Sequence, residues 1–159
     1  MRVTNKSGVL GHIGLDSDGV PNHEFPVIIY WEDTDAGGIV YHANYLKFTE
    51  RARSDLLKYI DINQQQMLAE EAPNFVVRDC TIEFLRPAKL EDVLTVKTTL
   101  IEMKSATLKM QQDIYRGDEV LIKSAVRIAC LQKNGTPARF SAQIRDKFAS
   151  LVKASGATL

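Results

Sequence analysis

Four successive segments between residues 75 and 131 alternate apolar and polar residues, and they constrain the fold more than any other feature. A period of two puts alternate side chains on opposite faces of a β-strand, so that one face can be buried. The predicted strands are Phe75–Arg86, Val93–Glu102, Ala106–Tyr115 and Val120–Leu131. Because short links join them, we expect antiparallel neighbours in a four-stranded meander.

A long amphipathic helix is predicted ahead of these strands, from about Asn44 to Tyr59. Its apolar residues recur at helical spacing and form one stripe. The stripe contains Tyr45, Phe48, Ala52, Leu56 and Ile60. Asn44 is a suitable N-cap, and Glu50 and Arg53 are spaced to form an ion pair on the helix surface. Shorter helices are expected over residues 62–70 and after a capping Ser141.

The β-branched run within Phe25–Trp31 predicts a further strand, which gives an α+β fold with one long helix against a five-stranded antiparallel sheet. We expect a single domain over residues 25–152 and a C-terminal tail over 153–159. Residues 1–24 have no hydrophobic period and contain Gly8, Gly11, Gly14 and Gly19, so we predict a flexible N-terminal extension. Composition leaves open that this segment folds onto the body.

The charge balance bears on possible partners. The 159 residues include 20 basic and 20 acidic side chains, for a formal net charge of +0. This gives no electrostatic case for nucleic acid. No apolar run approaches the ~18 residues of a membrane span, and no signal-peptide pattern opens the chain. Cys80 and Cys130 fall in predicted strands, where we expect buried apolar residues rather than a disulfide. We therefore predict a cytoplasmic protein.

The loop between the first strand and the long helix is the strongest candidate for chemistry. It carries Asp33 and Asp35, and it ends at a helix N-terminus, whose free N–H groups and dipole favour negative charge. Gly38 permits a tight turn and close approach of a ligand to the backbone. One hypothesis is acyl transfer to water, with Asp35 as base or nucleophile and an oxyanion site near His42. The alternative is a glycine-containing loop with solvated acids, and the same residues form only an unspecific metal-ligand set.

A longer pattern around this loop resembles the signature of the hotdog-fold acyl-CoA thioesterases. The pattern reads Tyr30-x-Glu32-Asp33-Thr34-Asp35-Ala36-Gly37-Gly38-x-Val40-Tyr41-His42-Ala43-Asn44-Tyr45-x-x-Phe48-x-Glu50-x-Ala52-Arg53. A second block reads Phe84-Leu85-Arg86-Pro87-Ala88 and is followed by Asp92. The resemblance covers about residues 25–150. It is strongest to the Tol–Pal-associated bacterial thioesterases, which are related to 4-hydroxybenzoyl-CoA thioesterase.

The resemblance implies a hotdog fold and the hydrolysis of acyl-CoA thioesters to a free acid and CoA, without a metal or redox cofactor. It places the catalytic acid on Asp35 and the second functional position on His42, with Gly38 and Tyr41 in contact with the substrate. A tyrosine takes the His42 place in the 4-hydroxybenzoyl-CoA relative, which indicates that the backbone N–H matters more than the side chain. Many relatives carry a tyrosine where this chain has Trp31.

Family members form dimers or tetramers with active sites between subunits, so a homodimer or homotetramer is expected. The family also places CoA-binding cations in a strand turn, where this chain offers Lys104; Lys133 is the next candidate. Two other functions stay open. One is a non-hydrolytic acyl-carrier or membrane-biogenesis accessory protein that uses the fold for binding, and the other is a hydratase or dehydratase.

Overall fold

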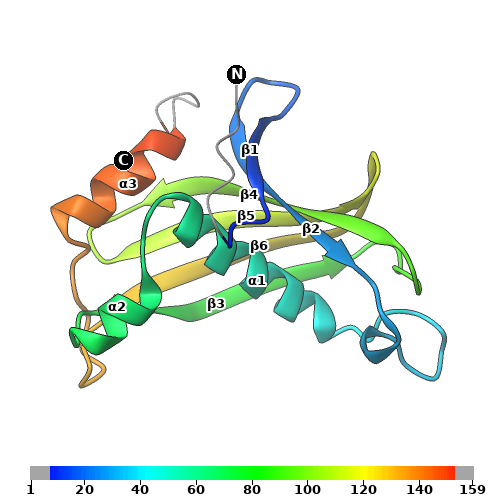
Figure 1. The fold of residues 1–159 in the computed structure, drawn as a ribbon, viewed down its shortest axis with the longest axis horizontal. Helices are drawn as coiled ribbons and strands as arrows, with labels where there is room; N and C mark the ends of the chain where they lie inside the picture. Colours follow the sequence, from blue (N-terminus) through cyan, green and yellow to red (C-terminus); the bar gives the residue numbers. More distant parts are fainter. Residues whose placement is uncertain (1–7, 153–159) are drawn as a thin grey trace.

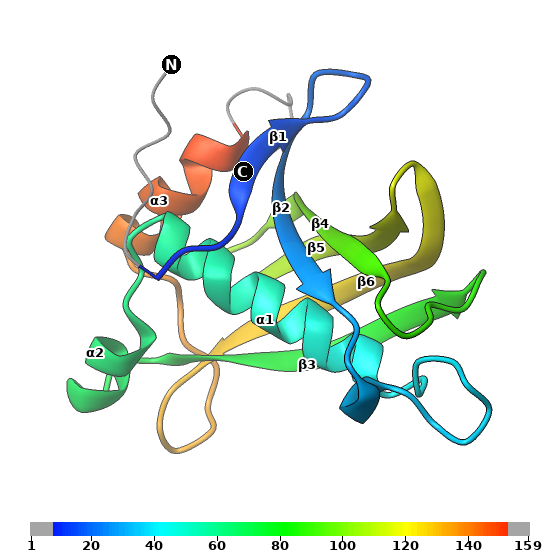
Figure 2. The same ribbon diagram turned by 45° about the vertical axis from the view of Figure 1, so that its right-hand side comes forward.

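The computed structural model describes residues 8–152 of the chain as one curved antiparallel sheet with three α-helices (Figure 1). The strands are β1 (His12–Leu15), β2 (Pro21–Ile28), β3 (Asn74–Phe84), β4 (Val93–Met103), β5 (Thr107–Arg116) and β6 (Glu119–Leu131). The helices are α1 (Asn44–Tyr59), α2 (Gln64–Ala69) and α3 (Ala142–Val152), with a short 3-10 turn over Trp31–Asp33. Figure 2 shows α1 lying across the concave side of the sheet, and this is the hotdog fold that the sequence predicts.

The sheet order is β1-β2-β4-β5-β6-β3, so the predicted meander is wrong in one respect. β3 pairs with β6 at the far edge and not with β4, the strand that follows it in sequence. Three strand spacings in a sheet amount to only about 14 Å, whereas the link 85–92 can extend to about 26 Å. The link is therefore long enough to cross the N-terminal end of α1. There, Ala88 N donates to the Tyr45 hydroxyl (3.0 Å) and Val40 N donates to Ala88 O (2.9 Å).

The predicted stripe of α1 is confirmed as the core of the molecule. Its five residues are each at most 8% exposed. Tyr45, Phe48 and Ala52 pack in one cluster with Leu94, Ile114 and Ile122 of the sheet, and Leu56 and Ile60 pack in a second cluster with Leu100, Met110 and Val126. Large apolar side chains that leave water together supply the main stabilising free energy of such a layer. The predicted cap at Ser141 is also present, because its Oγ accepts the Ile144 N–H (3.2 Å). Asn44 does not cap α1; its side chain turns back to the preceding loop.

The expected flexible extension is wrong for residues 8–24, while residues 1–7 and the predicted tail lie outside the described residues. β1 and β2 form a hairpin that extends the sheet to six strands. The Asp55 carboxylate of α1, which is buried, holds this hairpin. It accepts N–H bonds from Leu10 (2.8 Å) and Gly11 (2.9 Å), and it bonds to His23 Nε2 (2.9 Å). A Cβ at Gly11 would lie 2.3 Å from His23 Nε2, so only glycine fits there.

β3 is an exposed edge strand, and this corrects the expectation for one cysteine. Cys80 on β3 is exposed, whereas Cys130 on β6 is buried as predicted. Val77 and Phe84 on the same strand are 51% and 50% exposed. Within residues 8–152, no helix is long and apolar enough to cross a membrane.

Candidate active site

The loop that joins β2 to α1 is held in one conformation by Asp33, which is buried. Its carboxylate accepts the Tyr30 N–H (2.8 Å), and its backbone oxygen accepts both the Tyr41 N–H (2.9 Å) and the Asn44 side-chain amide (2.9 Å). These three bonds tie the beginning and the end of the loop to its middle. The hydrogen bonds of Asp33 therefore stabilise the loop, whereas Asp35 is exposed to solvent.

Asp35 lies at the tip of the loop and closes a tight turn. Its Oδ1 accepts the Gly37 N–H (2.8 Å), and its backbone oxygen accepts the Gly38 N–H (3.0 Å). Gly38 has φ +77°, a left-handed conformation that favours glycine. The second carboxylate oxygen has no hydrogen-bond partner in the part of the chain that the structure describes. Asp35 thus presents one oxygen to solvent from a fixed backbone.

His42 lies just before Ala43, the N-cap of α1, and contributes a backbone N–H that no described residue accepts. Its ring lies against Tyr41 (centroids 4.5 Å apart) and meets Phe84 of β3 edge-on (6.2 Å). Among the described residues, no hydrogen bond or ion pair joins the side chains of His42 and Asp35. The expected pair therefore shares one loop, but each group is free to act on a ligand separately.

Tyr45 is an important residue of this region that the sequence analysis assigned only to the core. Its buried ring packs against Phe48 and Phe84, with centroids 5.9 Å from each. Its hydroxyl accepts the Ala88 N–H, and burial raises the pKa of this phenol above its usual value. Tyr45 therefore anchors the 85–92 link beneath the helix start. A tyrosine in a helix stripe gives little indication of such a contact, because its partner is a backbone group far along the chain.

Lys104 and Lys133 lie away from this loop in the same protomer. Lys104 is in the β4–β5 turn and Lys133 follows β6, at the end of the sheet opposite to the loop (Figure 1). From Ile122, which pairs with Phe84, to Leu131 the strand β6 runs about 30 Å. Both ammonium groups face carboxylates: Lys104 lies 3.5 Å from Glu102, and Lys133 pairs with Glu71. The structure therefore does not bring these lysines to Asp35 within one chain.

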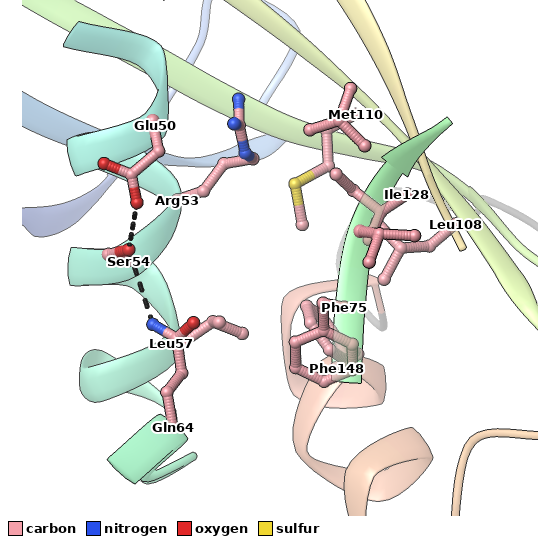
Figure 3. Close-up of a pocket in the computed structure, with 12 residues that line it drawn as sticks. Glu50, Arg53, Ser54, Leu57, Gln64, Phe75, Leu108, Met110, Ile128 and Phe148 are labelled. Carbon is pink, nitrogen blue, oxygen red and sulfur yellow. Dashed lines mark hydrogen bonds between the residues drawn. The ribbon is translucent and has the colours of Figure 1, made fainter. Parts of the chain in front are cut away.

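A cavity of about 160 Å³ lies between the middle of α1 and the sheet (Figure 3). Glu50, Arg53 and Ser54 of α1 form one wall, and residues such as Phe75, Met110 and Phe148 form the other. The predicted ion pair between Glu50 and Arg53 is wrong. The Glu50 carboxylate accepts the Ser54 hydroxyl (2.7 Å), and Arg53 donates to the Gln112 side-chain oxygen (2.7 Å). The two side chains leave the helix in different directions, which the spacing alone did not indicate.

An exposed carboxylate and an unused N–H lie beside the start of a helix that packs on an antiparallel sheet, and this arrangement suits attack on a carbonyl group in a hotdog fold. A carboxylate can activate water or attack a carbonyl carbon, and an N–H at a helix N-terminus can stabilise the resulting oxyanion. Among the described residues, no group of three or more His, Cys, Asp or Glu side chains is arranged to hold a metal ion.

Comparisons with known proteins agree with this assignment. The family model of the thioesterase-like superfamily matches residues 29–148, and the chain belongs to this family. The acyl-CoA thioesterase YbgC of Haemophilus influenzae is 42% identical over 125 residues, which cover 78% of this chain and 92% of the relative. The acyl-CoA thioester hydrolase YbgC of Escherichia coli O6:H1 is 42% identical over 108 residues, which cover 67% of this chain and 80% of the relative.

A solved structure supports the same family. The probable thioesterase from Bartonella henselae is 37% identical and superposes with a TM-score of 0.72, covering 76% of this chain and 99% of that chain. The resemblance to hotdog-fold thioesterases is thus confirmed. The family match begins at residue 29, after the β1–β2 hairpin.

Proposed function

We propose that this protein hydrolyses acyl-CoA thioesters to a free carboxylic acid and CoA. The observation that carries the proposal is the pairing, in one rigid loop, of an exposed Asp35 carboxylate with the unused backbone N–H of His42. Two relatives that are 42% identical bear the names acyl-CoA thioesterase and acyl-CoA thioester hydrolase, which supports the substrate class.

The reaction follows from these two groups. Asp35 either removes a proton from water as the water oxygen attacks the thioester carbonyl, or attacks that carbon itself. The carbonyl oxygen becomes negative and accepts the His42 N–H, to which the dipole of α1 adds a favourable field. The C–S bond then breaks, and the departing CoA thiolate takes up the proton that water has lost. With Asp35 as base, the acyl group is released directly as the free acid. With Asp35 as nucleophile, the acyl group is first held as an anhydride with the Asp35 carboxylate, which water then hydrolyses. Tyr41 and Gly38 border this position and contact the substrate.

The active enzyme is a homo-oligomer in which β3 pairs with β3 of a second copy. An eleven-residue edge strand with exposed Val76, Val77 and Phe84 leaves backbone groups and apolar surface without a cover. The strand at the opposite edge of the sheet is β1, which is only four residues long and offers a shorter surface for pairing. Closed two-fold pairing is the commonest way to cover such an edge. A homotetramer built from two such dimers fits the same surface.

This pairing also brings the two halves of the site together. From His42 to Arg53 the helix rises about 16 Å, so a short acyl chain cannot reach from the loop to the cavity of the same protomer. Antiparallel pairing of two β3 strands about their middle places the Phe84 end of one beside the Asn74 end of the other. His42 packs against Phe84 at one end of β3. Phe75 and Val76, at the Asn74 end of β3, line the cavity. Each cavity thereby faces the loop of the partner protomer.

The activity is tested by thiol release from a panel of acyl-CoAs, detected with DTNB. We expect Asp35→Asn to lower kcat by about 10²–10⁴-fold, because an amide is neither base nor nucleophile. Glu32→Gln, an exposed carboxylate in the same loop, is the matched control and should retain its rate. An Asp35→Asn variant with more than half of the wild-type kcat would contradict the assignment. Binding of acyl-CoA without any thiol release by the wild type would favour a carrier or accessory protein.

The β3 interface is tested through its native cysteine. Cys80 is exposed near the middle of β3, and Cys130 is buried. A short bismaleimide should therefore link two chains of the wild type but not of Cys80→Ser. A strict monomer in light scattering at micromolar concentration, with full activity, would refute a site between subunits. The cytoplasmic location stays a prediction.

A further inference from the structure

The cavity between α1 and the sheet has one polar and one apolar wall. Figure 3 shows Arg53 extending from α1 towards the sheet, while the Glu50 carboxylate turns aside to Ser54. The side chains opposite are apolar: Phe75, Leu108, Met110, Ile128 and Phe148. A ligand that fills this space meets hydrocarbon on one side, and on the other the Arg53 guanidinium together with Glu50, Ser54 and Gln64.

Arg53 has fewer partners than a partly buried cation requires. A guanidinium has five N–H donors, and the structure gives Arg53 one hydrogen bond, to the neutral side chain of Gln112. No carboxylate among the described residues forms an ion pair with it. Burial lowers the pKa of Arg53 from its usual value, against the opposing charge of Glu50. A partly desolvated cation that forms no ion pair is costly, and a ligand anion hydrogen-bonded to it would offset that cost.

Gln112 fixes the position of this guanidinium. It is 1% exposed, and its amide nitrogen donates to Thr49 O (3.0 Å) and Thr98 Oγ1 (3.0 Å). With both of these bonds formed, the side-chain oxygen can only point at Arg53. The sheet thus holds Arg53 through a buried polar network, and such networks specify one geometry when they are fully bonded.

From this arrangement we infer that Arg53 selects acyl groups that end in a carboxylate. The apolar wall packs against the methylene chain, and the guanidinium binds the terminal carboxylate. This inference rests on the proposed hydrolysis of acyl-CoA and names the substrate class within it. Arg53 is a specificity-determining residue, and Gln112 is its positioning residue.

The cavity volume guides the choice of a probe. The cavity opens to solvent on one side, and its volume of about 160 Å³ is close to that of an enclosed cavity of roughly 150 Å³ that holds benzene, so a six-carbon chain is the first probe. We expect hydrolysis to be best for the six-carbon adipoyl-CoA, compared with the four-carbon succinyl-CoA and the ten-carbon sebacoyl-CoA.

The test compares two substrates of equal length, adipoyl-CoA and hexanoyl-CoA, by kcat/KM. The wild type should prefer adipoyl-CoA by about tenfold or more, since a hydrogen-bonded charge pair contributes that much discrimination. Arg53→Met should lower the ratio to about one or below, and Arg53→Lys should restore part of it. Arg51→Met, an exposed arginine on the same helix, is the matched control and should keep the wild-type ratio.

Three outcomes would overturn the inference. The first is a wild-type preference for hexanoyl-CoA. The second is an equal fall in kcat/KM for both substrates in Arg53→Met, which would assign Arg53 to the reacting thioester instead. The third is a wild-type ratio in a folded Arg53→Met. Gln112→Leu adds a readout of positioning, because loss of the network should lower the ratio even with Arg53 present.

A readout without hydrolysis separates this inference from the proposed function. Calorimetric titration of the wild type with adipate and hexanoate measures the cavity alone. Adipate should bind more tightly, and Arg53→Met should lose that advantage. If no acyl-CoA releases thiol while this difference persists, the proposed function fails and the carboxylate site stands. If thiol is released but neither the ratio nor the binding depends on Arg53, the carboxylate site fails.

Discussion

Replacement of Asp55 by alanine should detach the N-terminal hairpin from α1 and destabilise the whole fold. The buried carboxylate makes three hydrogen bonds of 2.8–2.9 Å, to Leu10 N, Gly11 N and His23 Nε2. A hydrogen bond to a charged group contributes about 1.5–3 kcal/mol. Water that enters after truncation recovers part of this, so we expect Asp55→Ala to cost about 3–5 kcal/mol, as for other buried pairs that lose one partner.

The assay is thermal and urea unfolding, with hydrogen exchange as a local readout. A loss of that size lowers the Tm of a chain this long by about 6–20 °C. Amides of residues 10–15 should exchange faster than those of β5, because β1 loses its attachment. Asp146→Ala, an exposed aspartate on α3, should change the free energy of unfolding by about 0.5 kcal/mol or less. A loss below about 1 kcal/mol in Asp55→Ala would refute the reasoning.

Three further perturbations test other contacts. Burial lowers the pKa of His23, although the Asp55 carboxylate opposes this shift, so below about pH 6.5 the unfolded chain binds a proton that the folded chain does not. The free energy of unfolding should therefore fall as the pH decreases through this range, by at most about 1.4 kcal/mol per pH unit. Urea unfolding of His23→Gln, measured at the same pH values, should lack this fall. His42→Ala should keep part of the thioesterase activity, because the backbone N–H survives; complete loss of thiol release would argue for the side chain. Lys104→Glu and Lys133→Glu, compared in steady-state kinetics, should each raise KM with little change in kcat, since a remote phosphate contact is made equally in ground and transition states. An unchanged KM in both variants would remove these lysines from CoA binding.

The central helix and the long strands were predictable because their side-chain periods are unambiguous. α1 begins and ends at the predicted residues, since one apolar stripe over sixteen residues permits no other element. The predicted strands that became β3 to β6 have bounds within two residues of those observed. Their pairing was less predictable, because the link 85–92 has a length that permits either a neighbouring strand or a crossover.

The hairpin was missed for a different reason. β2 buries Asn22 and His23, at 3% and 1% exposed, so its buried residues do not alternate by hydrophobicity. The partner that makes such burial possible is Asp55, thirty-two residues further along the chain. A period of apolar residues cannot reveal a buried polar pair whose two halves lie on different elements. The same limit applies to Arg53 and Gln112, which meet across fifty-nine residues.

The active-site loop shows how the structure separates two acids that composition alone leaves equivalent. Asp33 and Asp35 are two residues apart in the same acidic stretch, and composition cannot rank them. Once folded, the Asp33 carboxylate is buried and bonded to Tyr30 N, so it is already committed to the loop's shape. One carboxylate oxygen of Asp35 accepts the Gly37 N–H within its own turn, and the other oxygen is exposed. A carboxylate with a free oxygen on a hydrogen-bonded loop can approach a thioester carbon repeatedly in one geometry. Asp35 meets this condition and Asp33 does not, which supports the role proposed for Asp35.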